Sequence, residues 1–187
     1  GNEDESVKYE CLGEIYNDNH KTTPLEQFRM ICKKCKKKEK KEKIKKRDLK
    51  KGKENELKVY EYLKNNVYPK IKKSKGKFAV FDFKLKNLRI EVKSRNCYSN
   101  TYKTTIVGKN KIKYLEKYNY EGVFYFLFED GLYRWDYNPN NPNEFYTKLG
   151  GRKDRGKKEI KKYAYIYKKY LKLITRSINS SVCLIDF

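Results

Sequence analysis

The chain has 187 residues, 37% of them hydrophobic and 38% charged, and its formal net charge is +23, from 47 Lys+Arg against 24 Asp+Glu. This length fits one ordinary domain, or one domain with a small appendage, whose core can fold without disulfides. No run of apolar residues is long enough to cross a membrane, and the acidic, polar start GNEDESVKYE is unlike a signal peptide. We therefore expect an intracellular protein that is neither secreted nor bound to a membrane.

The positive charge indicates a polyanionic partner, and nucleic acid is the leading candidate. Aromatic residues are also abundant, with 18 tyrosines, and Tyr98, Tyr102 and Trp135 are candidates for stacking on bases. Two alternatives remain open. A codon bias toward Lys, Asn, Tyr and Ile would raise the charge without any partner, and a Trp in a strand commonly lies in the core.

The amino-terminal segment, residues 1–35, contains four candidate metal ligands, Cys11, His20, Cys32 and Cys35. Three thiolates and one imidazole suit tetrahedral Zn²⁺, and the lysines inside Cys32-Lys-Lys-Cys35 favour ionised thiols. The set predicts a structural zinc module, with a redox pair or ordinary thiols as the alternative. The odd number of cysteines argues against a disulfide framework and for a reducing compartment.

Residues 36–50 are basic and low in complexity, which predicts an exposed helix or a flexible linker. From residue 51 to 187 the pattern is that of a folded domain with alternating helices and strands. The helices are expected at 56–66, at 109–119 and from 168 onward, and the strands at 77–83, 88–94, 122–128, 132–137 and 163–167. This order predicts a mixed α/β domain, in which the apolar strand 122–128 is buried on both faces.

The segment FDFKLKNLRIEVKS, residues 81–94, reads as a β-hairpin with Lys86 and Asn87 in the turn. In that register Phe83 pairs with Ile90, and two further pairs follow: Asp82 with Glu91 and Phe81 with Val92. Side chains alternate between the faces of a strand. One face is then apolar (Phe81, Phe83, Ile90, Val92), and the other carries Asp82, Glu91 and Lys93.

Two like charges directly opposite each other destabilise a strand pair, unless a cation lies between them. Mg²⁺ binds one or two carboxylates together with water and phosphate oxygens, and a neighbouring lysine can orient the attacking water or stabilise charge on a phosphate. Asp82, Glu91 and Lys93 therefore predict a metal site for phosphate chemistry. The alternative is the ordinary charged outer face of a half-exposed hairpin.

Asp82 followed by Glu91-Val92-Lys93, with apolar strands around both, resembles the motif of the PD-(D/E)xK nuclease superfamily. The helix before the hairpin carries Gly52, Glu56, Val59 and Leu63 in the spacing that this superfamily often shows. The resemblance extends over roughly residues 50–175, and one departure is Phe81, where the motif has proline.

The resemblance implies a restriction-endonuclease-like mixed sheet flanked by helices, and an endonuclease that hydrolyses DNA with Mg²⁺ or Mn²⁺. It implies Asp82 and Glu91 as metal ligands, Lys93 as the catalytic lysine and Glu56 as an accessory ligand or water-positioning group. The amino-terminal segment is similar to zinc modules of viral and phage nucleases, although those usually have a second CxxC where this chain has Cys11 alone. A viral protein of this kind would work in the cytoplasm or nucleus of its host.

Other classes remain open from the sequence: a nuclease directed at RNA, a junction resolvase, and a non-catalytic protein that binds zinc and nucleic acid. The oligomeric state is also open, and a dimer would allow both strands to be cut.

Further basic residues are candidates for contacting the nucleic acid. Lys109, Lys111 and Lys113 are expected along a substrate groove, and Arg152 and Arg155 are expected to clamp phosphates beside Gly150 and Gly151. For the two arginines, the alternative is a charged surface turn.

Overall fold

The computed structural model describes residues 24–76, 79–150 and 161–178, and for residues 24–35 and 37 it describes the backbone alone. The chain divides into two compact units, residues 1–47 and residues 48–187. The helix α2 (Pro24–Asn66) runs from the first into the second, so the predicted domain boundaries after residues 35 and 50 both lie inside a helix. Cys11, His20, Arg152 and Arg155 lie outside the described residues.

Residues 36–50 are helical rather than a linker, and their described side chains are mostly exposed. Lysine and glutamate have good helix propensity, and Glu39 with Lys43 and Glu42 with Lys46 have the four-residue spacing, glutamate first, that stabilises a helix surface. The segment therefore forms a helix although it has almost no apolar face.

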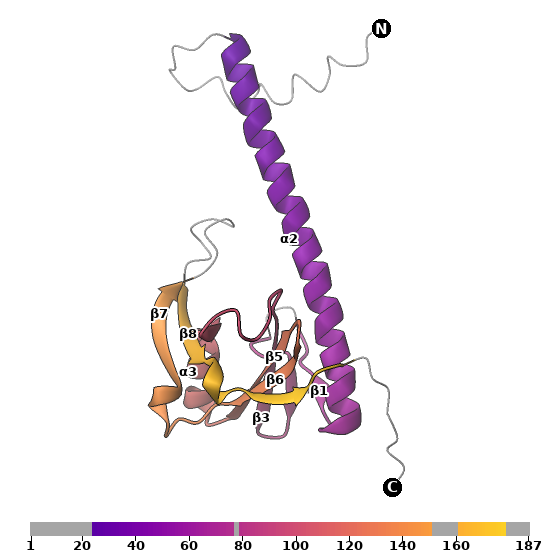
Figure 1. Ribbon diagram of the computed structural model, residues 1–187, viewed down its shortest axis with the longest axis vertical. Coiled ribbons are helices and arrows are strands. Elements are labelled where there is room, and N and C mark those ends of the chain that lie inside the picture. The colour runs from indigo at the N-terminus through magenta and orange to yellow at the C-terminus, as the bar shows by residue number, and fades with distance from the viewer. Residues whose placement is uncertain (1–23, 77–78, 151–160, 179–187) are drawn as a thin grey trace. The chain divides into compact units, whose positions relative to one another are not determined.

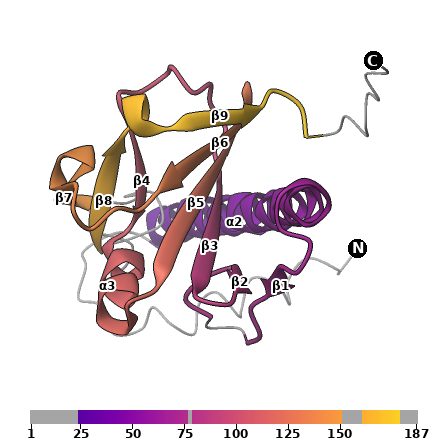
Figure 2. The same cartoon turned by 90° about the horizontal axis from the view of Figure 1, so that it is seen from below.

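The second unit contains a six-stranded sheet in the order β1-β2-β3-β5-β6-β9 and a three-stranded sheet in the order β4-β8-β7 (Figures 1 and 2). The larger sheet consists of β1 (Lys72–Lys73), β2 (Phe83–Leu85), β3 (Leu88–Ser94), β5 (Glu121–Phe128), β6 (Gly131–Asp136) and β9 (Lys172–Thr175). The smaller sheet consists of β4 (Thr104–Gly108), β7 (Phe145–Gly150) and β8 (Lys161–Tyr167). Helix α3 (Lys109–Tyr118) connects β4 to β5, and short 3-10 helices cover Pro142–Glu144 and Lys168–Tyr170. Among the strands that the structure describes, β3 and β5 form the only parallel pair, so the domain is mixed α/β, as predicted.

Apolar side chains pack on both faces of the larger sheet. On one face, Val59 and Leu63 of α2 pack with Phe83, Ile90, Val92, Tyr125 and Leu132. On the other face, α3 and the smaller sheet cover a second cluster made up of Phe81, Val107, Ile112, Leu115, Phe124, Phe126, Phe128, Trp135, Ala164 and Ile166. Since β5 contributes to both clusters, the prediction that it is buried on both faces is confirmed.

The hairpin register is confirmed over β2, with Phe83 opposite Ile90 and the turn at Lys86 and Asn87, where Lys86 has a positive φ of 46°. The strand pairing does not extend to the predicted pairs Asp82 with Glu91 and Phe81 with Val92. The predicted strand 77–83 is wrong over residues 79–82, because the backbone bends over residues 80–82 and β2 begins only at Phe83. Phe81 consequently packs in the second cluster, with its ring 5.8 Å from Tyr114 and 6.1 Å from Phe124. The predicted apolar face of the hairpin therefore loses Phe81.

The helix predicted from residue 168 is also wrong. The chain makes one 3-10 turn and then enters β9, which pairs with β6 at the edge of the larger sheet. Strands β1, β4 and β7 were not predicted. In the stretches that the structure describes, no helix is long and apolar enough to cross a membrane.

Candidate active site

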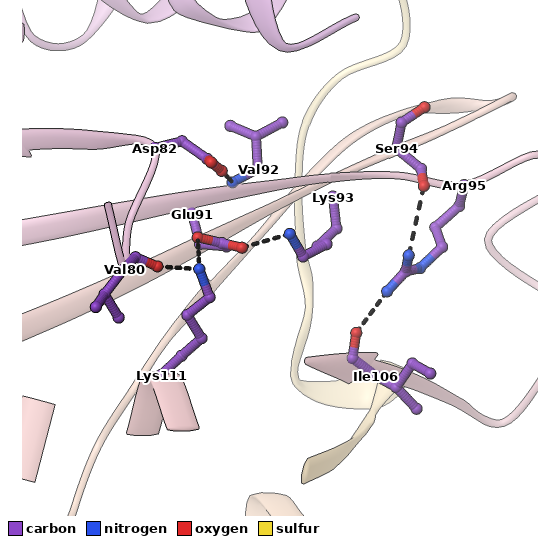
Figure 3. Close-up of polar contacts among 9 residues, drawn as sticks. All are labelled: Val80, Asp82, Glu91, Val92, Lys93, Ser94, Arg95, Ile106 and Lys111. Atoms are coloured by element: carbon purple, nitrogen blue, oxygen red, sulfur yellow. Dashed lines mark hydrogen bonds and ion pairs between the residues drawn. The ribbon is translucent and has the colours of Figure 1, made fainter. Parts of the chain in front are cut away.

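Strand β3 carries two of the predicted site residues on one of its faces. Ile90 and Val92 face the cluster with α2, so the alternation of the strand directs Glu91 and Lys93 to the opposite side. Glu91 is 1% exposed, and the Lys93 ammonium forms an ion pair with its Oε1 atom (Figure 3). A buried carboxylate requires such compensation, since an unpaired buried charge is costly.

A second ammonium reaches the same carboxylate from α3. Lys111 Nζ lies 2.8 Å from Glu91 Oε2 and also donates a hydrogen bond to the Val80 carbonyl (Figure 3). Lys111 was predicted to contact nucleic acid in a groove, but here its side chain is 16% exposed and is engaged inside the site. The two lysines leave Glu91 paired at both oxygens.

Asp82 lies at the end of the bend, directly before β2. Its Oδ2 atom accepts a hydrogen bond of 2.7 Å from the Val92 backbone N–H (Figure 3). The predicted register placed Phe81 opposite Val92, but in the structure it is Asp82 that contacts Val92. The bend thus holds the Asp82 carboxylate against β3, one residue from Glu91 along that strand.

The environment of Asp82 raises its pKa from 3.8 to about 6. Burial is the largest cause and the Glu91 charge is the second, while Lys93 and the Val92 N–H oppose the rise. Glu56 adds a smaller contribution in the same direction as Glu91. Asp82 therefore lies in a site where further negative charge is unfavourable and a cation would be favourable.

Glu56 is half-buried on α2, and its neighbour Asn55 fastens this helix to the end of β3. Asn55 Nδ2 donates a hydrogen bond of 2.7 Å to Ser94 Oγ. The effect of Glu56 on the pKa of Asp82 is consistent with a place near the site. Its accessory role remains a prediction.

Arg95 connects the end of β3 to β4 and was missed by the sequence analysis. Its Nε donates to Thr105 Oγ1 at 3.2 Å. Its guanidinium also donates to the Ile106 carbonyl, as Figure 3 shows. Burial lowers the pKa of this guanidinium. Arg95 thus positions the strand that carries Glu91 and Lys93.

A family described as "Phage putative PDDEXK endonuclease" matches residues 37–167, which are 131 of the 187 residues. The chain belongs to this family. No curated protein and no solved structure matches it. The matched region of this PD-(D/E)xK nuclease family member includes Glu56, Asp82, Glu91 and Lys93, so the predicted superfamily is confirmed.

The donors at the site fit a divalent ion that takes most of its ligands from elsewhere. Among the described residues, no three His, Cys, Asp or Glu side chains gather in a way that could hold a metal. Two carboxylates, Asp82 and Glu91, are nevertheless enough for Mg²⁺ or Mn²⁺ when water and phosphate supply the rest. Glu91 is buried and ammonium groups pair with both of its oxygens, so positive charge at this carboxylate is already favoured, and a divalent ion would supply charge of the same sign.

The remaining predicted residues have varied environments. Lys113 is exposed, whereas Lys109 is half-buried, with Nζ 3.9 Å from Glu116 Oε1 and 5.3 Å from the Phe145 ring centroid. Trp135 is 1% exposed and donates to Glu144 Oε2, so it belongs to the core and cannot stack on bases. Tyr98 and Tyr102 are 57% and 66% exposed and remain candidates for stacking. The side chains of Cys32 and Cys35 lie outside the described residues.

Proposed function

We propose that this PD-(D/E)xK family member is a divalent-metal-dependent endonuclease that hydrolyses phosphodiester bonds in DNA. Asp82 and Glu91 are its metal ligands, Lys93 is its catalytic lysine, and Glu56 is an accessory group. The observation that carries the proposal is the burial of Glu91, a carboxylate 1% exposed, between two ammonium groups and beside a second carboxylate with a raised pKa. A carboxyl group with a raised pKa, such as that of Asp82, is typical of functional sites.

Mg²⁺ or Mn²⁺, when bound, supplies a Lewis acid that neutralises charge on the phosphate. The chain itself contributes orientation and positive charge. Lys93 is 33% exposed, more than Lys111 at 16%, so its ammonium is the more accessible to a phosphate oxygen or to the attacking water. In the reaction one water adds to phosphorus, one P–O ester bond breaks, and the leaving oxygen takes up a proton.

The substrate class follows from charge. A net charge of +23 favours a polyanion, and Lys109, Lys113, Arg152 and Arg155 are proposed to contact phosphates as the strand approaches. DNA is the proposed substrate, and RNA or branched DNA are alternatives that the test below separates.

A cleavage panel tests this function directly. The protein is incubated with plasmid, linear DNA, four-way junctions and RNA, each with Mg²⁺, with Mn²⁺ and with EDTA. We expect plasmid DNA to be nicked or linearised with either metal and left intact with EDTA. Salt-sensitive binding to all substrates without cleavage would instead identify a non-catalytic nucleic-acid-binding protein.

The zinc module stays a proposal that rests on the sequence alone. Cys11, His20, Cys32 and Cys35 supply three thiolates and one imidazole, the donor set of a structural zinc site. Elemental analysis of the purified protein is expected to find about one zinc per chain, and Cys32→Ser/Cys35→Ser is expected to lose it while residues 56–175 stay folded. Wild-type protein that contains no zinc would contradict the module.

A further inference from the structure

Lys111 is a charged group in the site that the proposed reaction does not use. Its ammonium lies 2.8 Å from Glu91 Oε2 and donates to the Val80 carbonyl, and it lies 5.3 Å from the centre of the Phe81 ring. Its side chain is 16% exposed, half as much as that of Lys93. Lys111 therefore contacts Val80 and Phe81, the two residues that directly precede Asp82.

Lys111 places a positive charge beside the buried Glu91 carboxylate, which needs such a charge when no metal is bound. Glu91 is 1% exposed, and a carboxylate in that environment is stable only with positive charge beside it. Lys93 provides part of that charge at Oε1, and Lys111 provides the rest at Oε2. An ion bound to Glu91 would supply the same compensation.

We propose that Lys111 is the built-in counter-ion of Glu91 in the metal-free enzyme and that it releases this carboxylate when a divalent ion binds. The proposal rests on the proposed function, because it takes Glu91 as a metal ligand. The ammonium and the ion compete for one carboxylate and repel each other, so Lys111 sets how much metal the enzyme requires. After the exchange the Val80 carbonyl still holds the ammonium close to the site.

A merely structural lysine would behave differently. If Lys111 only fastened α3 to β3, its loss would loosen the site and weaken metal binding. If it is a counter-ion, removing its charge removes a repulsion of the incoming ion, so metal binding becomes tighter even as the metal-free protein becomes less stable. These opposite signs distinguish the two roles.

The first measurement is Mn²⁺ binding by isothermal titration calorimetry for wild type, Lys111→Met and Lys117→Met. Methionine keeps most of the length of lysine without its charge. Lys117 is an exposed lysine on the same helix, near the Tyr118 ring and outside the proposed site, so its replacement controls for net charge. We expect Lys111→Met to bind Mn²⁺ at least about tenfold more tightly than wild type, and Lys117→Met to match wild type.

The second measurement is thermal unfolding of the same proteins in EDTA and in saturating Mn²⁺. In EDTA we expect Lys111→Met to melt about 3–6 °C below wild type, because Glu91 loses a partner. Mn²⁺ should narrow that gap, since the ion replaces the missing charge and tighter binding stabilises the folded state further. Lys111→Arg, which keeps the charge, should return both the affinity and the EDTA melting temperature toward wild type.

The outcomes separate the two proposals. The counter-ion role is overturned if Lys111→Met binds Mn²⁺ no more tightly than wild type, or if Mn²⁺ leaves the difference in melting temperature between the two proteins unchanged. In either case, Mn²⁺ binding by wild type would still support the metal site. Failure of wild type to bind Mn²⁺ overturns both. If Lys111→Met does not fold in EDTA, Lys111→Gln takes its place, because glutamine can still donate to the Val80 carbonyl, and the same outcomes apply.

Discussion

Asp82→Asn is expected to lower the rate of DNA cleavage by more than about a hundredfold, since losing even a group that orients a metal ligand costs up to about that much. DNA binding should be unchanged or tighter, because one negative charge that faces the phosphates is removed. Single-turnover cleavage and equilibrium binding to the same labelled duplex check the two halves of this prediction. Loss of binding together with cleavage would mean that Asp82 serves the fold rather than the chemistry.

The same substitution is expected to raise the free energy of unfolding of the metal-free protein at neutral and alkaline pH. The folded state raises the pKa of Asp82 from 3.8 to about 6, so the folded protein holds this proton more tightly than the unfolded chain does. Ionising Asp82 therefore costs the folded state nothing below pH 3.8, progressively more between pH 3.8 and about 6, and the full amount above about pH 6. The rise in the pKa of Asp82 to about 6 corresponds to a loss of at most about 3 kcal/mol in the free energy of unfolding above about pH 6.

Asparagine carries no charge, and its carbonyl oxygen can still accept the Val92 N–H. In EDTA at pH 8, Asp82→Asn should then have a free energy of unfolding about 1–3 kcal/mol higher than wild type. Near pH 4 this advantage should largely disappear. Denaturant unfolding at both pH values provides the check, and an advantage of equal size at pH 4 and pH 8 would show that ionisation of Asp82 is not its source.

Lys93→Ala is the substitution with the second largest expected effect. It should lower turnover by at least about a hundredfold, as removal of one preorganised donor to a developing charge does, while Mn²⁺ still binds. Metal affinity should be equal to that of wild type or greater, because an ammonium beside Glu91 Oε1 has been removed. The prediction therefore separates catalysis from metal binding.

Single-turnover cleavage in saturating Mn²⁺, with calorimetry of Mn²⁺ binding, measures these two effects. Lys84→Ala is the matched control, because Lys84 is an exposed lysine on β2 of the same hairpin and faces Arg89 across the strands. It should cleave like wild type. A Lys93→Ala protein that cleaves as fast as the control would remove Lys93 from the reaction, and one that no longer binds Mn²⁺ would give Lys93 a structural role.

The sequence predicted those parts of the hairpin that depend on local pattern. Alternation over residues 88–94 and the short turn at Lys86 and Asn87 were sufficient for the register of Phe83 with Ile90. The bend over residues 80–82 was not predictable in this way, since the run around Phe81 alternates as a strand does. Phe81 leaves the hairpin face because tertiary packing against Tyr114 and Phe124 outweighs the local pattern.

Lys111 shows why the site could be predicted only in part. Asp82, Glu91 and Lys93 lie within twelve residues of one another, so motif spacing brought them together. Lys111 comes to Glu91 from a helix twenty residues later in the chain. The sequence suggested that Lys111 contacts nucleic acid, but among 47 Lys+Arg nothing linked it to Glu91. Strand β9 was not predictable for a similar reason. Its short apolar run is compatible with a helix or a strand, and pairing with β6 at the edge of the sheet decides for the strand.

We propose that Asp82 and Glu91 share one divalent ion. Anomalous diffraction from crystals of the protein soaked in Mn²⁺ tests it most directly, because manganese is located by its own scattering. We expect one manganese peak about 2.1 Å from a carboxylate oxygen of each residue, with Lys93 beside it and Lys111 displaced from Glu91 Oε2. Carboxylates that point apart with no peak between them, in crystals that contain Mn²⁺, would contradict it.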